Sequence, residues 1–510
     1  MTKAPSRPLD VVFIEADSSG LAYQDLGKVF AAIETPTWSL LLAQSCRAKG
    51  YGVAILDQNA EKITDRAAVE RINELKPRLA VFVVYGQNPN SGTTNMAGAN
   101  RLCRTLKVAY PEIKTCFVGS HTSALPREVL ALPWVDFVLL NEGVYALQNL
   151  LRTNLKDNLG AVLGIGRKVD GDEILNAPQS VVPQDRMDID LPGYAWDLLP
   201  YDRKPLDLYR SHFWHAGFLH EKRTPFAAIY TSLGCRFACD FCMVNIVNRT
   251  DNAAEISSSD SRSMRFWSPD FITKEFEKLA SLRVETVRIA DEMFFLDRRH
   301  YEPLLHNILD RSLEFRMWSY ARVDTVRQEA LDLFLRAGIG WLALGIEAGN
   351  QTVRKEVSKG SFRDINIREV VGGIRERGFN VIANYIFGFP DDSIETMQET
   401  LDLALELCTE MANMYPCQAL PGSPLYHTAR QRGWKLPDSP EGFAFLSYET
   451  LPLPTKHLSA PQVLRFRDDA WQAYFSYEPY LRLVESKFGE QERRNVEEMA
   501  KIRLRRRILE

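Results

Sequence analysis

The sequence predicts an α/β protein with two domains in tandem, each built on a parallel sheet, followed by a helical C-terminal segment. The first observation is that short apolar β-rich runs alternate with helical patterns before residue 150 and again from residue 227, as in parallel sheets with crossover helices. The second is the length of 510 residues, which exceeds what one hydrophobic core usually supports. Together they predict an open doubly wound sheet and then a partial barrel.

The composition excludes several classes of protein. With 45% hydrophobic and 25% charged residues, the chain has ordinary globular usage, which excludes disorder as its main state. Lys and Arg total 62 against 66 acidic residues, which gives a net charge of −4. A protein with this charge has no positive electrostatic field that would attract a polyanion, so we expect no nucleic-acid partner. The longest clean apolar run, Leu79 to Tyr85, is too short for a membrane span, and the N-terminus lacks a signal-peptide pattern. We therefore expect a cytoplasmic protein without a membrane span.

The first domain, predicted over residues 1–154, has the layout of a flavodoxin-like (Rossmann-like) fold. Each predicted strand is followed by a helical pattern. The first helix is expected to have Thr35 as N-cap and Pro36 in its first position, and to end at Lys49-Gly50. The five strands are predicted at Val11–Ile14, Val53–Leu56, Leu79–Val84, Thr115–Val118 and Val135–Leu140.

Three loops of this domain are candidates for ligand binding, because ligands of such sheets bind beyond the carboxyl ends of the strands. They are residues 85–94, 119–126 and 141–145, all rich in Gly, Asn, Ser or Thr. These residues can present many hydrogen-bond donors to a large polar ligand. Ordinary turn chemistry explains the same composition and remains the alternative.

The rest of the chain divides into three parts. Residues 155–222 carry spaced prolines and are predicted as an ordered linker, and residues 223–430 as the barrel. Residues 431–510 are predicted as a helical C-terminal domain, with a capping box from Ser459 to Gln462 and a basic end that we interpret as a solvated helix terminus. The six barrel strands are predicted near residues 227–231, 286–290, 315–319, 341–346, 381–387 and 413–419. In barrels the site lies at the carboxyl ends of the strands.

Three of the eight cysteines are packed into one loop after the first barrel strand. Cys235, Cys239 and Cys242 have the spacing Cys-x3-Cys-x2-Cys. A structural zinc site usually has four Cys or His ligands, and no further Cys pair or nearby His pair completes this one. A redox disulfide is the other alternative. Three thiolates suit a four-iron cluster with one iron left open, so we predict these cysteines as metal ligands.

The cysteine loop, with Phe241 before the third cysteine, resembles the signature of radical S-adenosylmethionine (SAM) enzymes. Further segments match that family in order: ADEMFFLD (290–297), WSYARVD (318–324), LGIEAGN (344–350) with VSKG (357–360), and NYIFGFPDD (384–392). The resemblance implies a 4Fe-4S cluster whose open iron chelates SAM. It also implies cofactor contacts by five polar residues: Asp291 and Glu292 at the amino group, Ser319 and Arg322 at the carboxylate, and Glu347 near the ribose.

The first domain resembles the cobalamin-binding domain that precedes the radical barrel in one large subclass of these enzymes. The matching stretches are SLLLAQSCRAKGYGVAILD, GSHTSALPREVL and VDFVLLNEG. The Asp-x-His-x-x-Gly signature that supplies a histidine to cobalt is absent, so we expect His121 to contact a loop or the corrinoid edge. The residues that the resemblance assigns to cobalamin are Ser120, His121, Thr122, Asn141 and Glu142.

What this resemblance implies is a class B methyltransferase-like enzyme that acts on a small-molecule, biosynthetic substrate. One SAM would methylate cobalamin, and a second would yield a 5′-deoxyadenosyl radical that activates an unactivated carbon to receive the methyl group. An external donor of flavodoxin or ferredoxin type would supply electrons. The alternative is an oxidative cyclase or rearrangement enzyme without net methylation. Two further alternatives are a methylthiotransferase and, from a different class of protein, a cobalamin or redox sensor. Catalytic residues and the substrate itself are not encoded by any motif.

The remaining cysteines are interpreted first as buried apolar groups. Cys46, Cys103 and Cys408 fall in helical patterns and Cys116 in a strand. Cys417 is the exception, because it lies on the last barrel strand and can face the site as a reactive thiol. Other residues that can reach a substrate, although packing is the simpler interpretation, are Trp214, His215, His220, Tyr385 and Tyr415.

Overall fold

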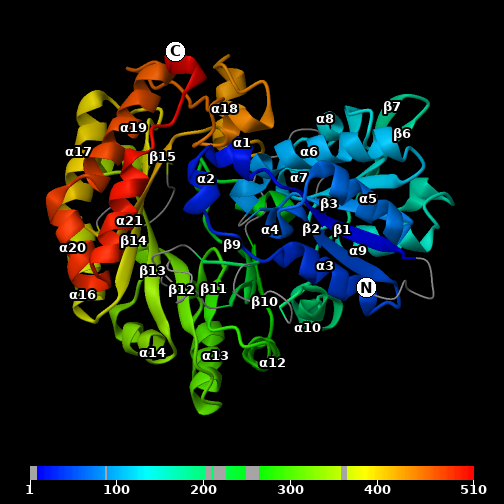
Figure 1. Ribbon diagram of the computed structural model, residues 1–510, viewed down its shortest axis with the longest axis horizontal. Helices are drawn as coiled ribbons and strands as arrows, with labels where there is room; N and C mark the ends of the chain where they lie inside the picture. The colour runs from blue at the N-terminus through cyan, green and yellow to red at the C-terminus, as the bar shows by residue number, and fades with distance from the viewer. Residues whose placement is uncertain (1–8, 87–88, 202–207, 212–224, 249–262, 358–364) are drawn as a thin grey trace.

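Two sheets lie side by side in the protein, each with its own helices (Figure 1). The structure is a computed structural model that describes residues 9–86, 89–201, 208–211, 225–248, 263–357 and 365–510. The order of the elements follows the predicted tandem arrangement, with the α/β N-terminal part on one side and the barrel on the other. In the described residues, no helix is both long and apolar enough to cross a membrane.

The N-terminal sheet has seven strands in the order β2-β1-β3-β4-β5-β6-β7. The first five are parallel, in the flavodoxin-like order, and they match the predicted positions. The strands are β1 (Val11–Glu15), β2 (Val53–Asp57), β3 (Leu79–Val83), β4 (Lys114–Val118), β5 (Phe137–Leu139), β6 (Ile165–Val169) and β7 (Asp172–Leu175). The last two are antiparallel and extend the sheet, so residues 165–175 of the predicted linker are part of the N-terminal sheet.

Helices cover both faces of this sheet, and each face has its own packed core. On one face α3 (Thr37–Arg47) and α9 (Val144–Arg152) pack against the strands. On the other face lie α5 (Asp65–Leu75), α6 (Gly92–Ala109) and α8 (Pro126–Ala131). Alternate residues of the buried strands point to opposite faces, which explains why nearly every strand residue is apolar. Shorter helices follow the strand ends: α1 (Ser19–Tyr23), α2 (Leu26–Val29), α4 (Gln58–Glu61), α7 (Ser120–Ala124) and α10 (Met187–Asp190).

The start of α3 differs from the prediction. The helix begins at Thr37, one residue later than expected, and Thr35 does not cap it. The Thr35 hydroxyl instead donates to the carbonyl of Ala228 (3.3 Å) and accepts from the Ala228 backbone N–H (2.9 Å). Thr35 is thus used in a contact between domains, which no local sequence pattern encodes.

The second sheet is the predicted partial barrel of six parallel strands, in the order β15-β14-β13-β12-β11-β8. Its strands are β8 (Phe226–Ile229), β11 (Thr286–Ile289), β12 (Arg316–Arg322), β13 (Ile339–Glu347), β14 (Asn380–Phe387) and β15 (Met411–Pro416). Its helices are α12 (Pro269–Ser281), α13 (Arg298–Asp310), α14 (Leu331–Arg336), α15 (Gln351–Val357), α16 (Ile367–Glu376) and α17 (Ile394–Leu407). A hairpin of β9 (Ser232–Cys235) and β10 (Ser263–Phe266) follows the first strand.

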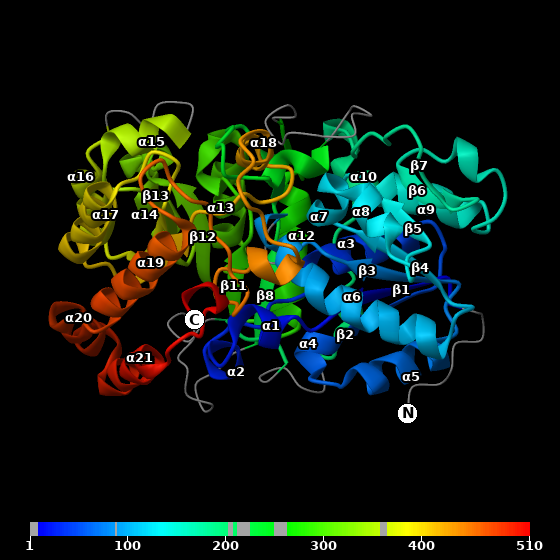
Figure 2. The ribbon, with the colours of Figure 1, turned by 90° about the horizontal axis from the view of Figure 1, so that it is seen from above.

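The C-terminal segment packs beside the last barrel strands (Figure 2). It contains α18 (Pro424–Gln431), α19 (Ala460–Phe475), α20 (Glu478–Phe488) and α21 (Glu490–Lys501), and α19 opens with the predicted capping box. The basic end is exposed, as expected, at Lys501, Arg503, Arg505 and Arg507, but most of it lies beyond the last α-helix, and Arg506 differs from the others. Helix α21 stops at Lys501, and Arg506 is only 3% exposed, because it pairs with Asp468 (2.9 Å) and donates to the Ser447 carbonyl (2.8 Å).

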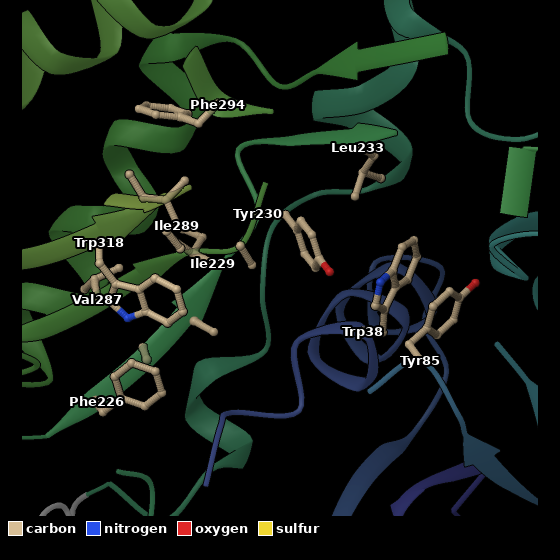
Figure 3. Close-up of a cluster of buried hydrophobic side chains, with 14 of the residues drawn as sticks. Trp38, Tyr85, Phe226, Ile229, Tyr230, Leu233, Val287, Ile289, Phe294 and Trp318 are labelled. Atoms are coloured by element: carbon tan, nitrogen blue, oxygen red, sulfur yellow. The ribbon is translucent and has the colours of Figure 1, made fainter. Parts of the chain in front are cut away.

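Aromatic side chains join the two domains. Trp38 and Tyr85 from the N-terminal domain stack with ring centroids 4.1 Å apart, and Tyr230, directly after β8, lies 6.3 Å from Trp38 (Figure 3). Close by, Arg288 of β11 forms an ion pair with Glu34 of the N-terminal domain, and both side chains are buried. A hydrophobic, fully buried seam of this kind holds the two sheets in one arrangement.

Candidate active site

The cysteine loop lies at the carboxyl end of the barrel, directly after β9. Each thiol is half-buried. The Phe237 N–H donates to the Cys235 sulfur and the Val244 N–H to the Cys242 sulfur, both at 3.5 Å. Burial raises the pKa of all three thiols to about 12, so a strong cation is needed to hold them as thiolates. Iron supplies that charge, and this donor set therefore fits the cluster.

The same loop receives a guanidinium group from β12. Arg322 lies 3.5 Å from the Phe237 ring centroid and 4.0 Å from the Cys239 sulfur, and Asp324 binds it through two hydrogen bonds of 2.5 Å. Cysteine and arginine come from different segments, and the barrel brings them together. Around any one point of the described chain, no three His, Cys, Asp or Glu side chains are grouped as ligands of a single metal ion.

Asp291 and Glu292, after β11, have different surroundings. Asp291 accepts hydrogen bonds from the Thr231 N–H and hydroxyl (both 2.6 Å) and from the Ser232 hydroxyl (2.5 Å). It is therefore occupied in holding the start of the cysteine hairpin. The Glu292 atom Oε2 is buried without a hydrogen-bond partner among the described residues, and burial raises the pKa of this carboxyl to about 8. Glu292 is the member of the pair that is free to receive a cationic ligand group.

Glu347 ends β13 in a left-handed conformation, with φ of 68°. The register of β13 against β14 shifts between Gly345 and Glu347, which turns the carboxylate at the strand end. Non-glycine residues in this conformation cost free energy and gather at functional sites. Burial raises the pKa of Glu347 to about 7, and the charge of Arg322 opposes that rise.

Ser319 does not join this group. Trp318, Tyr320 and Arg322 alternate with it along β12, so Ser319 lies on the opposite face of the strand from Arg322. Its partners across the sheet are Ile289 and Leu342, both fully buried. The predicted contact of Ser319 with the SAM carboxylate therefore has no support in the geometry of the strand.

The predicted cobalamin residues of α7 are buried. His121 places Nδ1 3.1 Å from the Thr93 hydroxyl, and burial lowers the pKa of the imidazole to about 4, which keeps it neutral. The Thr122 hydroxyl has no hydrogen-bond partner in the described part of the chain. Ser120 packs so closely against the start of α6 that a Cβ on Gly92 would lie 2.0 Å from its hydroxyl oxygen.

Asn141 and Glu142 make contacts within the protein. The Asn141 amide donates to the Gln179 carbonyl (2.8 Å). Glu142 accepts from the Val182 N–H and pairs with Arg265 of β10 at 2.8 Å, and it is 2% exposed. Glu142 thus ties the N-terminal domain to the hairpin that carries Cys235, a role that the sequence does not reveal.

A cavity lies at the carboxyl ends of β1, β2 and β3. Strand β1 stands between β2 and β3, so the cavity is at the point where the strand order reverses, and such points bind ligands in open α/β sheets. Two polar atoms of lining residues, Trp38 Nε1 and Glu34 Oε1, are buried without a hydrogen-bond partner among the described residues. They fit a ligand that, like the amide-rich corrin, offers both donors and acceptors.

Only the first of the three predicted loops reaches this cavity. Gly86, Ser91 and Thr94 line it, whereas none of the described lining residues comes from 119–126 or 141–145. Glu34 and Arg288 are also missed by the sequence analysis. A single arginine inside the apolar strand β11 is the one signal that was available, because a buried charge needs a partner.

A second cavity lies inside the barrel. It shares Tyr23, Ala31, Ala32, Phe445 and Leu446 with the first, so the two are neighbours along one wall. Aromatic and aliphatic side chains dominate its lining, among them Trp318, Ile382, Met411, Met414, Tyr415 and Trp471. The barrel interior therefore suits a largely apolar molecule.

The other candidates contribute less. Cys417 is 1% exposed and packs in a small apolar cluster with Phe389 and Leu425, so the structure gives no support to a reactive thiol there. Tyr385 is fully buried, whereas Tyr415 lines the barrel cavity. Trp214, His215, His220 and residues 358–360 of the VSKG segment lie outside the described residues.

Comparison with family models accounts for both domains. Residues 229–404 match the radical SAM superfamily, and residues 23–151 match the B12 binding domain. The class defined by the fold and the site is thus a radical SAM enzyme with a second cofactor domain. More particularly, the chain belongs to the cobalamin-dependent radical SAM enzymes of methyltransferase-like type, and its cofactors are a 4Fe-4S cluster, SAM and cobalamin.

Relatives and solved structures agree with this family. An uncharacterized methyltransferase of Pyrococcus horikoshii is 22% identical over 400 residues, 77% of this chain and 78% of that protein. An anaerobic magnesium-protoporphyrin IX monomethyl ester cyclase of Rubrivivax gelatinosus is 24% identical, over 84% of this chain and 70% of the cyclase. The radical SAM methyltransferase TsrM of Kitasatospora setae has the same fold, with a TM-score of 0.65 and 15% identity over 93% of this chain and 90% of TsrM.

Proposed function

We propose that the protein transfers a methyl group from SAM, by way of cobalamin, to an unactivated carbon of a small, largely apolar molecule. The observation that carries the proposal is the pair of neighbouring cavities, one at the switch point of the cobalamin domain and one inside the barrel. When bound, the cofactors supply the radical that removes a hydrogen and the carrier that delivers the methyl group. The protein holds the substrate between them and excludes water.

The protein's own residues have separable roles in this proposal. Cys235, Cys239 and Cys242 hold the cluster. Glu292 and Arg322 bind the ammonium and carboxylate groups of SAM, since one offers a free buried carboxylate and the other a guanidinium beside the cysteine loop. Glu347 contacts the ribose region. Ser120, His121, Thr122, Asn141 and Glu142 shape the loops of the cobalamin domain, and the last two do so through contacts within the protein.

The experiment is an anaerobic turnover with the reconstituted protein, dithionite and SAM that carries a deuterated methyl group. Methylation consumes two SAM molecules per product, so 5′-deoxyadenosine and S-adenosylhomocysteine should form in about equal amounts, with deuterium in the product. Two electrons are required in each turnover, and we propose that a flavodoxin or ferredoxin supplies them. Candidate substrates are the apolar metabolites of the pathways that the neighbouring genes encode. Absence of label from every product would overturn the proposal.

A second candidate is an oxidative cyclisation or rearrangement without net methylation. The similarity to magnesium-protoporphyrin IX monomethyl ester cyclases over 80% of this chain or more favours it. In that case 5′-deoxyadenosine should form without S-adenosylhomocysteine. The same turnover therefore separates the two functions.

A further inference from the structure

An asparagine of the cobalamin domain reaches the cysteine loop of the barrel. Asn90 lies in a single 3-10 turn, Pro89–Ser91, after β3. Its side-chain Nδ2 is 3.5 Å from the Cys242 sulfur, and its Oδ1 accepts from the Met243 backbone N–H at 2.9 Å. The two partners are 152 and 153 positions away in the sequence, so only the folded arrangement of both domains creates this contact.

The contact fixes which way the amide faces. The Met243 N–H can only donate, so the amide oxygen of Asn90 must face it, and the NH2 group then faces the sulfur. A thiolate that binds iron has no proton to donate, so in the cluster-bound state Asn90 is the donor. Cys242 receives a second N–H, from Val244, also at 3.5 Å.

The turn that carries Asn90 is held in place by the cobalamin domain itself. The next residues begin α6, where Gly92 packs against Ser120 and the carbonyl of Val84, and Thr93 contacts His121. Ser91 lines the cavity at the switch point. The turn that carries Asn90 therefore lies between this cavity and the cysteine loop.

We propose that Asn90 is a positioning residue that raises the reduction potential of the cluster by donating a hydrogen bond to Cys242. The reduced cluster carries one more negative charge, and an N–H aimed at a ligand sulfur stabilises that charge more than it stabilises the oxidised state. The inference rests on the proposed cluster at the three cysteines. Its consequence is that the cobalamin domain helps to set how readily the barrel accepts an electron.

The test is a redox titration of the reconstituted cluster, followed by electron paramagnetic resonance, in the full chain. Asn90→Leu removes the donor and keeps the branched shape of the side chain, and Asn90→Ala removes it without crowding the loop. In both variants the midpoint potential should fall, so that the ratio of reduced to oxidised cluster at a fixed potential drops by up to about tenfold, or ~59 mV for a one-electron couple. Iron and sulfide content shows whether the cluster is complete.

Asn149→Leu is the matched control, because among the described residues the Asn149 side chain contacts only Arg152 of the same helix, from which it accepts a surface hydrogen bond. It should leave the potential unchanged. Complete clusters with the wild-type potential in either Asn90 variant would overturn the inference and assign Asn90 a purely structural role. Failure of the wild-type protein to form any cluster would instead overturn the function on which the inference rests.

Discussion

Arg288 and Glu34 form an ion pair that is closed off from solvent in the seam between the domains. Arg288 also donates to the Tyr320 hydroxyl at 3.0 Å and lies over the rings of Trp318 and Tyr320, each with its centroid 5.0 Å away. A buried pair contributes little net stability, whereas removing one partner leaves a buried charge without compensation. The pair therefore fixes the arrangement of the seam more than it strengthens the fold.

Glu34→Gln should lower the free energy of unfolding by about 3–5 kcal/mol, because Arg288 then keeps its charge without a counterion. Urea denaturation measures the loss. The double variant Glu34→Gln/Arg288→Met should recover most of it, and Arg298→Gln, which breaks an exposed pair with Glu302, should change stability by less than about 1 kcal/mol. A double variant as unstable as the single one would contradict the prediction.

Glu292→Gln should weaken SAM binding by about 10- to 100-fold, which corresponds to the roughly 1.5–3 kcal/mol of a hydrogen bond to a charged group. The physical reason is that the buried Oε2 has no other hydrogen-bond partner among the described residues, and an ammonium group beside it favours the ionised carboxylate over the neutral acid. Equilibrium binding of SAM to the reconstituted protein measures the effect, with the cluster spectrum as a control for assembly. Asp291→Asn should instead destabilise the hairpin, since Asp291 already serves Thr231 and Ser232.

At the scale of elements, the sequence predicts the strands better than the connections. A strand such as Leu79–Val83 is buried along its whole length, so its apolar run has clear limits. By contrast, β6 and β7 are partly exposed antiparallel strands at one end of the sheet, with β7 at its edge, and their polar residues give no such signal. Contacts between distant segments, such as Asn90 with Cys242, leave no local pattern. The three cluster cysteines could be predicted because they lie within eight residues of one another in the sequence.

The turn between β4 and α7 gives a test at this scale. Gly119 has φ of 149°, and an added Cβ would lie 2.4 Å from the Val84 carbonyl oxygen, so Gly119→Ala must displace backbone. We expect weaker corrinoid binding, measured by the absorption spectrum after reconstitution, with the iron content unchanged. Gly50→Ala, also at positive φ (87°) but with open space around the added atom, is the matched control and should bind corrinoid normally.

At the scale of the whole molecule, a side chain of one domain forms hydrogen bonds with backbone groups of the other. The Thr35 hydroxyl both donates to and accepts from Ala228 of β8. Thr35→Val keeps the volume but leaves the Ala228 N–H and carbonyl without this partner, at a cost of about 1–3 kcal/mol per buried unsatisfied group. Scanning calorimetry should show a lower unfolding temperature. Thr35→Ser should retain most of the stability, and equal losses in both variants would contradict this role of the hydroxyl.

The Thr35 contact lies on β8, the first strand of the barrel sheet, and covers part of its edge. Among the described strands β8 pairs only with β11, so its other side is the free edge of an open sheet. Free edges are templates for pairing with other chains, and proteins protect them. The N-terminal domain supplies that protection here. A barrel expressed without it should therefore self-associate through β8, and fusion of the two halves in one chain guards against aggregation as well as bringing the cofactors together.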